Sequence, residues 1–247
     1  MQAPVNEENN GANLGTLYLS YLHKISQRPC APAEELPITK KAFLASLCSL
    51  LRVGLRLEIS GRENLPAEAP FILCPNHQSH LDAFVLSMAL PSNIRYRLCS
   101  FAARDHFSDP IIRFMSSLVG AILIERRSFP LEALRIGTQI LSQKRALLIF
   151  PEGTRSRSGE LGKFRRGASL LSLLTNCPII PVHIDGTHLI LPPDSYRPQG
   201  FKTWLKLKRH RIEVRFGAAH FPKPEQEDTK LLTSFLRDEI ENLGTLD

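Results

Sequence analysis

Short runs of apolar residues alternate with longer helical patterns along this 247-residue chain. A continuous apolar run bounded by polar residues is typical of a strand that is buried on both faces of a sheet. In the intervals between these runs, apolar residues recur at every third or fourth position, which is the spacing of one helical face. The alternation predicts an α/β fold with a single, largely parallel (mixed) sheet that is covered by helices. The expected strands are 55–60, 71–75, 120–124, 146–150, 179–184 and 212–216, and the expected helices lie near 79–90, 109–118, 130–143, 166–176 and 226–242.

The N-terminal segment has a different pattern. Residues 1–10 are polar and acidic, and we expect them to be disordered. Apolar residues then recur at helical spacing over 14–25, and a second helix is expected to start near Thr39. The apolar sector of the second helix is wide, and Lys40 and Lys41 stand at its start. Such a helix can lie in a membrane interface with its apolar side down, or it can pack on the core of the protein.

These patterns divide the chain into three parts. Residues 1–10 form a disordered N-terminus, residues 11–56 an amphipathic helical pair for membrane attachment, and residues 57–247 the α/β domain. The longest uncharged apolar-rich run, residues 42–51, is about half as long as a membrane-spanning helix requires. The first ten residues lack the order of a secretory signal, and the five cysteines form no CxxC pair. We therefore expect a peripheral or monotopic protein on the cytoplasmic face of a membrane.

The chain is basic, with a net charge of +7 and an isoelectric point near 9.3. Of its 31 basic and 24 acidic residues, two and four lie within residues 1–36, which leaves 29 basic against 20 acidic in the remainder. A basic body favours an anionic partner such as nucleic acid, an anionic lipid surface or a phosphorylated substrate. Charge alone does not decide among these partners, so a non-enzymatic module that binds membranes or nucleic acid is one alternative.

Three polar clusters follow predicted strands. They are NHQSHLD at 76–82, ERRS at 125–128 and PEGTRSRSG at 151–159. In parallel α/β sheets, ligands bind at the carboxyl ends of the strands. We therefore expect these three clusters to form the functional site together.

His77 and Asp82 are the candidate catalytic pair. On one continuous helix, five residues turn the chain by roughly 500°, so the two side chains would point about 140° apart. They can meet when His77 lies in the turn before a helix and Asp82 lies in its first turns, with Ser79 as the N-cap. The carboxylate then fixes the imidazole tautomer and leaves the other ring nitrogen as a base. The alternative is that Asp82 only caps the helix.

A metal site is a second interpretation of the same residues. His77, His80 and Asp82 could bind a metal ion in a metal-dependent hydrolase, with His183 or His188 as a further ligand. The spacing H-x-x-H-x-D is not the H-E-x-x-H of a helix-borne zinc site, and His183 stands in an apolar strand pattern. We therefore expect no metal in the site.

A basic loop extends over residues 150–168. Its cationic side chains are Arg155, Arg157, Lys163, Arg165 and Arg166. Arginine binds phosphate through a planar fork of donors, so this loop could hold a phosphorylated substrate. Arg126 or Arg127 could complete the anion site. A solvated charge run is the alternative.

Together, these segments resemble the glycerolipid acyltransferase family, typified by 1-acyl-sn-glycerol-3-phosphate (lysophosphatidic acid) acyltransferases. The resemblance covers about residues 70–185 in four ordered blocks: NHQSHLD, GAILIER, FPEGTRS with the following FRRGA, and IIPV. It implies transfer of an acyl chain from a thioester to the free hydroxyl of lysophosphatidic acid, which gives phosphatidic acid. Other members acylate glycerol-3-phosphate, other lysophospholipids or amphipathic alcohols, and the sequence does not separate these acceptors.

The resemblance also implies roles for individual residues. His77 would be the general base, and Asp82 would orient and stabilise it without a covalent acyl-enzyme. The residues implied to bind substrate are Arg126, Glu152, Gly153, Thr154, Arg155, Lys163, Arg166 and Pro181. Pro181 would shape an apolar pocket or acyl tunnel. The resemblance implies no cofactor, with acyl-CoA or an acyl carrier protein thioester as co-substrate, and its partners are membrane lipids and lysophosphatidic acid but no nucleic acid.

Overall fold

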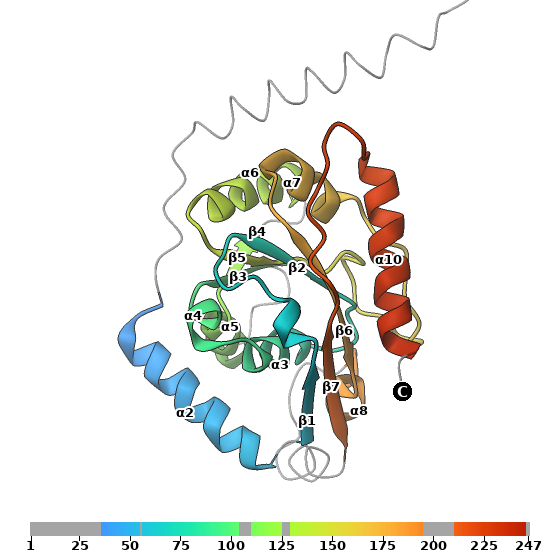
Figure 1. Ribbon diagram of the computed structural model, residues 1–247. Coiled ribbons are helices and arrows are strands. Elements are labelled where there is room, and N and C mark those ends of the chain that lie inside the picture. The colour runs from blue at the N-terminus through green and yellow to red at the C-terminus, as the bar shows by residue number, and fades with distance from the viewer. Residues whose placement is uncertain (1–35, 55, 104–109, 125–128, 195–209, 246–247) are drawn as a thin grey trace, which may run out of the picture.

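The computed structural model of the protein describes residues 36–54, 56–103, 110–124, 129–194 and 210–245. These residues form a seven-stranded sheet with helices on both faces (Figure 1). The strand order is β1-β7-β6-β2-β5-β3-β4, and neighbours are parallel except for the antiparallel pair β6 and β7. The predicted α/β fold with a mixed, largely parallel sheet is confirmed. The strands are β1 (Arg56–Ser60), β2 (Phe71–Pro75), β3 (Leu98–Ala103), β4 (Ala121–Ile124), β5 (Ala146–Leu148), β6 (Ile179–Asp185) and β7 (Arg211–Phe216).

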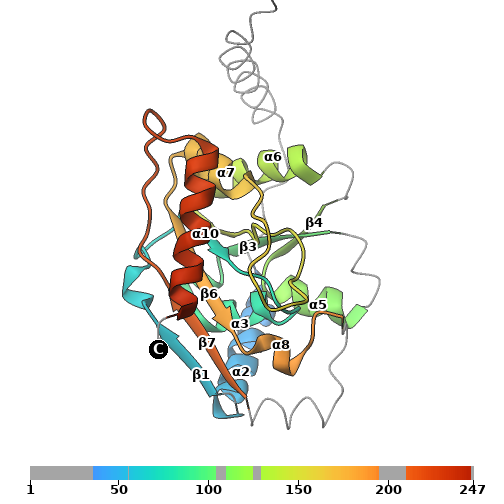
Figure 2. The ribbon, with the colours of Figure 1, turned by 90° about the vertical axis from the view of Figure 1, so that its right-hand side faces the viewer.

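The helices form layers on the two faces of the sheet (Figures 1 and 2). α6, α7 and α10 cover one face, whereas α3, α4 and α5 cover the other, with α2 packed outside α3 and α5. The helices are α2 (Ile38–Gly54), α3 (Asp82–Ala89), α4 (Ser92–Arg95), α5 (Pro110–Leu118), α6 (Phe129–Ser142), α7 (Gly167–Thr175), α8 (Thr187–Ile190) and α10 (Thr229–Thr245), with a 3-10 turn, η2, at Arg62–Asn64.

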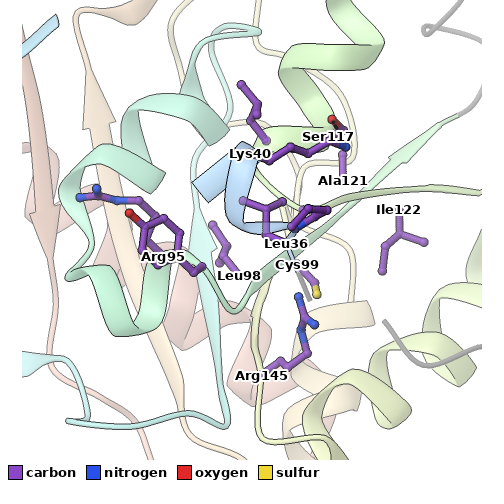
Figure 3. Close-up of a pocket in the computed structure, with 13 residues that line it drawn as sticks. Leu36, Lys40, Arg95, Leu98, Cys99, Ser117, Ala121, Ile122 and Arg145 are labelled. Carbon is purple, nitrogen blue, oxygen red and sulfur yellow. Dashed lines mark hydrogen bonds between the residues drawn. The ribbon is translucent and has the colours of Figure 1, made fainter. Parts of the chain in front are cut away.

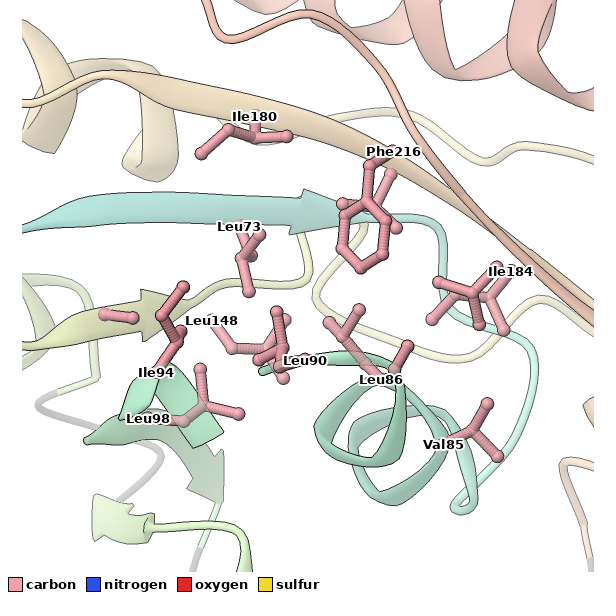
Figure 4. Close-up of a cluster of buried hydrophobic side chains, with 14 of the residues drawn as sticks. Leu73, Val85, Leu86, Leu90, Ile94, Leu98, Leu148, Ile180, Ile184 and Phe216 are labelled. Atoms are coloured by element: carbon pink, nitrogen blue, oxygen red, sulfur yellow. The ribbon is translucent and has the colours of Figure 1, made fainter. Parts of the chain in front are cut away.

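The central strands send alternate side chains into two apolar cores. From β2, Phe71 and Leu73 join the core beneath α3, whereas Ile72 and Cys74 join the core beneath α6, α7 and α10. Figure 4 shows the first of these cores, where Leu73 and side chains from neighbouring strands point toward Leu86 of α3. Because both faces of these strands are buried, their sequences are continuous apolar runs rather than alternating ones.

The structure corrects several predicted elements. β3, in the segment LCSFAA, lies between β5 and β4 although no strand was predicted there. Cysteine, serine and alanine are weak signals for a strand, because β-branched and aromatic residues dominate strand composition. The short helices α4 and α8 were not predicted, and β5 ends at Leu148, earlier than expected. α3 begins at Asp82 rather than near residue 79, for a reason that lies in the site itself.

α2 is the second of the two predicted N-terminal helices, and the first falls outside the described residues. Its Leu44 and Cys48 are buried against α3 and α5. Ile38 and Phe43 face outward and are 78% and 46% exposed, and Phe114 of α5 is 43% exposed. The wide apolar sector therefore packs partly on the protein's own core and partly remains uncovered by described residues. Among the helices that the structure describes, none combines the length and apolar character that crossing a membrane requires.

Candidate active site

The candidate active site lies at the carboxyl ends of β2 and β5. His77 follows β2, and Asp82 is the first residue of α3. The imidazole Nδ1 of His77 lies 2.8 Å from Oδ2 of Asp82, and the aspartate side chain is 0% exposed whereas that of His77 is 20% exposed. The two side chains thus meet across the start of a helix, which is the placement that their spacing predicted.

The Asp82 carboxylate also explains why α3 begins late. Besides the imidazole, its Oδ2 accepts the backbone N–H groups of Gln78 at 2.7 Å and Ser79 at 2.8 Å. A carboxylate that binds these amides stabilises a local turn, which competes with helical hydrogen bonding. Ser79 is therefore not the N-cap that was predicted, and Leu81 occupies that position.

The contacts of His77 leave one ring nitrogen available for proton transfer. Because an ionised carboxylate only accepts hydrogen bonds, Nδ1 carries the hydrogen and Nε2 carries the lone pair. Within the described residues, the ring forms its hydrogen bond to Asp82 alone. Its plane is stacked on Phe150, with ring centroids 3.8 Å apart and an interplanar angle of 20°. An imidazole fixed in this way can act as a general base through Nε2.

The loop after β5 holds the main chain of His77. The His77 N–H donates to Oε1 of Glu152 at 2.9 Å, and the His77 carbonyl accepts from the Ser156 N–H at 2.8 Å. The other Glu152 oxygen accepts the Gly162 N–H at 3.0 Å. Burial raises the pKa of the Glu152 carboxyl, and these backbone hydrogen bonds act in the opposite direction. Both carboxylate oxygens of Glu152, a predicted substrate-binding residue, thus face backbone amides. They join residues 76–82, here called the histidine turn, to the basic loop.

Part of the predicted anion site lies beside the histidine turn. A guanidinium N–H of Arg155 donates to the ring nitrogen Nε2 of His80, which places this arginine next to the turn. Gly153 and Thr154 are exposed just before it, and Lys163 is exposed further along the same loop. Arg155, with Gly153 and Thr154 exposed just before it, therefore forms a basic rim beside the histidine turn, and Lys163 extends the same loop.

The remaining predicted substrate-binding residues are placed elsewhere. Arg166 is exposed and faces the start of α10, where backbone hydrogen bonds lower the pKa of Asp228 and the arginine adds an attractive charge. Pro181 lies in β6, and a Cβ added to Gly217 would approach its ring to 2.8 Å. The Pro181 side chain lies on the face of the sheet that α10 covers. Arg126 lies outside the described residues.

The segment after β6 completes the site and was not predicted. The hydroxyl of Thr187 donates to Oδ1 of Asp82 at 2.5 Å. The side-chain amide of Asn76 donates to the Ile184 carbonyl at 2.9 Å and accepts the Ile184 N–H at 2.7 Å, which ties the histidine turn to β6. A sequence signal existed, because the polar residues 185–188 follow a predicted strand just as the other clusters do.

The histidine side chains of this turn form hydrogen bonds to other side chains instead of pointing toward a shared metal position. His77 is bonded to Asp82, and His80 accepts from an arginine. His183 lies in β6 under α10, where a Cβ added to Gly244 would approach its Nε2 to 2.8 Å. Across the part of the chain that the structure describes, no three His, Cys, Asp or Glu side chains are placed to share a metal ion.

A cavity of about 260 Å³ lies away from this site (Figure 3). Its wall includes the first residues of β3 and β4 and the start of α2, and Lys40 there donates to the Ser117 hydroxyl at 3.2 Å. Arg145 lies beside Cys99, whose pKa is raised by burial and lowered in part by this arginine. Because β2, β3, β4 and β5 run parallel, the cavity is at the amino-terminal edge and His77 is at the carboxyl edge.

Comparison with known proteins assigns the chain to a family. The acyltransferase family model matches residues 56–185, which is more than half of the chain. The protein therefore belongs to the acyltransferase family, as its four sequence blocks indicated.

Similar proteins of the family carry a more specific name. A 1-acyl-sn-glycerol-3-phosphate acyltransferase of Saccharomyces cerevisiae is 34% identical over 149 residues, which are 58% of this chain and 47% of that protein. An enzyme of the same name from Borreliella burgdorferi is 26% identical over 196 residues, 78% of this chain and 73% of that protein. The chain spans about half the length of most of the curated relatives it matches.

A solved structure supports the fold. The 1-acyl-sn-glycerophosphate acyltransferase PlsC from Thermotoga maritima has a TM-score of 0.60 to this protein at 18% sequence identity. The superposition covers 94% of this chain and 91% of the other. The likeness therefore extends over nearly the whole α/β architecture.

Proposed function

We propose that the protein transfers an acyl chain from an acyl thioester to the free hydroxyl of 1-acyl-sn-glycerol-3-phosphate and so forms phosphatidic acid. The observation that carries the proposal is the His77–Asp82 pair, whose Nε2 is available beside a basic loop. Membership of the acyltransferase family and the names of the yeast and Borreliella relatives support this choice of reaction.

The proposed reaction requires one proton relay. Nε2 of His77 takes the proton of the acceptor hydroxyl as the hydroxyl oxygen attacks the thioester carbonyl carbon. The ester C–O bond forms, the C–S bond breaks, and the leaving sulfur takes the proton back from the imidazolium as free thiol. Asp82 stabilises the imidazolium and keeps the ring oriented. A thioester has a good leaving group, so a positioned base is sufficient without a cofactor or a covalent acyl-enzyme. The donor is acyl-CoA or acyl carrier protein.

The basic rim binds the acceptor phosphate in this proposal. Arg155 is adjacent to the histidine turn through His80, and a guanidinium offers paired donors that match phosphate oxygens. Arg155→Gln is therefore expected to raise the KM for the acceptor more than it lowers kcat. Arg157→Gln is the matched control, because Arg157 lies in the same loop with a side chain that is 81% exposed. An equal effect of both substitutions would indicate a diffuse attraction rather than a phosphate site.

The enzyme is proposed to work on the cytoplasmic face of a membrane, to which it binds peripherally or monotopically. Phe43 of α2 and Phe114 of α5 are in edge-to-face contact with ring centroids 5.5 Å apart, and both remain partly exposed. Lys41 is two residues before Phe43 in the sequence. Exposed aromatic rings with basic neighbours suit an anionic lipid interface. Replacing both phenylalanines by serine is expected to weaken sedimentation with vesicles that contain anionic lipid. Phe221→Ser is the control, because that side chain is 66% exposed in the loop before α10.

The decisive experiment follows thiol release from an acyl thioester in the presence of lysophosphatidic acid. His77→Ala is expected to lose at least ~10²-fold in kcat, because a general base contributes about that much. His220→Ala is the matched control, since His220 forms a similar pair with Glu227 at 3.0 Å away from the histidine turn. Full activity of the His77 variant would refute the proposal.

The identity of the acceptor is tested separately. Glycerol-3-phosphate, other lysophospholipids and amphipathic alcohols compete with lysophosphatidic acid in the same assay. Lysophosphatidic acid is expected to have the highest kcat/KM, because it carries both a phosphate for the basic rim and an acyl chain for the lipid interface. A higher kcat/KM for another acceptor would assign the same chemistry to that substrate instead.

A further inference from the structure

Thr187 holds the second oxygen of the Asp82 carboxylate. Oδ2 of Asp82 receives its three donors from the histidine turn, namely the imidazole and two backbone N–H groups. Oδ1 receives the hydroxyl of Thr187 at 2.5 Å, from a residue 105 positions further along the chain. Both Asp82 and Thr187 are 0% exposed. The two oxygens are therefore held from opposite sides by different parts of the fold.

The position of Thr187 is built into the backbone. Gly186, directly before it, has a φ of 80°, and a Cβ there would lie 2.1 Å from the backbone oxygen of Arg211. Only glycine fits this turn from β6 into α8. Just upstream, the two hydrogen bonds between Asn76 and Ile184 fix the end of β6 against β2. These contacts place the Thr187 hydroxyl at the carboxylate without involving the His77 imidazole.

We propose that Thr187 is a positioning residue, which acts on the reaction by fixing the rotation of the Asp82 carboxylate. This inference rests on the proposed acyl transfer. A carboxylate that is anchored through one oxygen alone can rotate about its Cβ–Cγ bond, and the lone pair that His77 Nδ1 requires then moves with it. Removal of the hydroxyl also leaves a buried carboxylate oxygen without its donor, and hydrogen bonds to charged groups are among the strong ones. The imidazole would consequently be misaligned at the step where it takes the proton.

The experiment compares Thr187→Val with Thr187→Ser in the purified full chain. Valine has nearly the same shape but no hydroxyl, whereas serine retains the hydroxyl. Thr187→Val is expected to lower kcat by about 10- to 100-fold, with the KM values for lysophosphatidic acid and for the acyl thioester unchanged. Thr187→Ser is expected to retain kcat within about threefold of the wild type, because its hydroxyl keeps the donor. Thermal unfolding and circular dichroism of each variant confirm the fold, and Thr187→Ala replaces the valine variant if valine does not fold.

Ser172→Ala is the matched control. Its hydroxyl is as buried as that of Thr187 but donates to the Cys177 carbonyl at 2.8 Å, within α7 and its C-terminal turn. The control is expected to change stability without changing kcat. A wild-type kcat in folded Thr187→Val, or an equal loss in the serine variant, would overturn the positioning role while acyl transfer stands. A wild-type protein that releases no thiol with any acceptor would instead refute the proposed function.

Discussion

Replacing Asn76 by aspartate is expected to make folding strongly dependent on pH. Asn76 is 1% exposed, and its amide donates to the Ile184 carbonyl at 2.9 Å while accepting the Ile184 N–H at 2.7 Å. In Asn76→Asp, an ionised carboxylate would place an oxygen against that carbonyl oxygen. A protonated carboxyl would restore both hydrogen bonds, because its O–H can replace the amide N–H.

The magnitude follows from the free energy of protonating the introduced carboxyl. Aspartic acid in an unfolded chain has a pKa of about 3.9, and each pH unit is worth about 1.4 kcal/mol, so a protonated group costs about 4 kcal/mol at pH 7. The folded variant can bind a proton on the introduced carboxyl at this cost, so about 4 kcal/mol is the upper limit of its loss in unfolding free energy. The fold raises the pKa of the introduced carboxyl. The loss therefore grows as pH rises and shrinks by up to about 1.4 kcal/mol per unit on acidification.

Urea unfolding of the variant and the wild type at pH 7, 6 and 5 measures this difference. Asn64→Asp is the matched control, because Asn64 Nδ2 also donates to a strand carbonyl, that of Phe216 at 2.9 Å, but the residue is exposed. Water can solvate the carboxylate there, so the control is expected to lose only about 1–2 kcal/mol at every pH. A loss in Asn76→Asp that is equal at pH 7 and pH 5 would refute the two-bond geometry.

Three further changes test other contacts. Burial lowers the pKa of His183, so stability should fall as pH drops below about 6.5, and urea unfolding of His183→Gln at pH 7.5 and 5.5 should show a smaller fall than the wild type. Gly186→Ala should reduce the unfolding free energy by more than about 3 kcal/mol, because its Cβ would lie 2.1 Å from the Arg211 carbonyl oxygen; a wild-type melting temperature would contradict this. Glu152→Asp cannot reach both backbone N–H groups that the longer side chain binds, so thiol release should slow by about tenfold, whereas an unchanged kcat would make Glu152 dispensable.

Local spacing was sufficient to predict the contact between His77 and Asp82 and several of the central strands. His77 and Asp82 are five positions apart, and a turn followed by a helix is the arrangement that brings them together. β2 and β6 are buried on both faces, so their sequences carry a continuous apolar signal. β3 lacks that signal because its small side chains resemble those of a loop, and its place in the sheet follows from the strands on either side.

Long-range contacts explain what the sequence could not reveal. Thr187 meets Asp82 across 105 positions, and no local pattern encodes such a hydrogen bond. The family resemblance implied that Glu152 is a substrate ligand, but its carboxylate binds the amides of His77 and Gly162. The residue type indicated an acceptor of hydrogen bonds, and the fold determined which donors it meets.

The loop after β5 binds His77 through the backbone N–H and carbonyl of that residue, and this has a consequence for protein engineering. Every amino acid except proline carries the same N–H and carbonyl, so the loop after β5 can hold this position with many different flanking side chains. Gln78 and His80 can therefore be changed to residues other than proline while the main-chain hydrogen bonds of His77 remain. Because the His80 ring contacts Arg155, a small library at these two positions also varies how the basic loop is held, and so which acceptors the site accommodates.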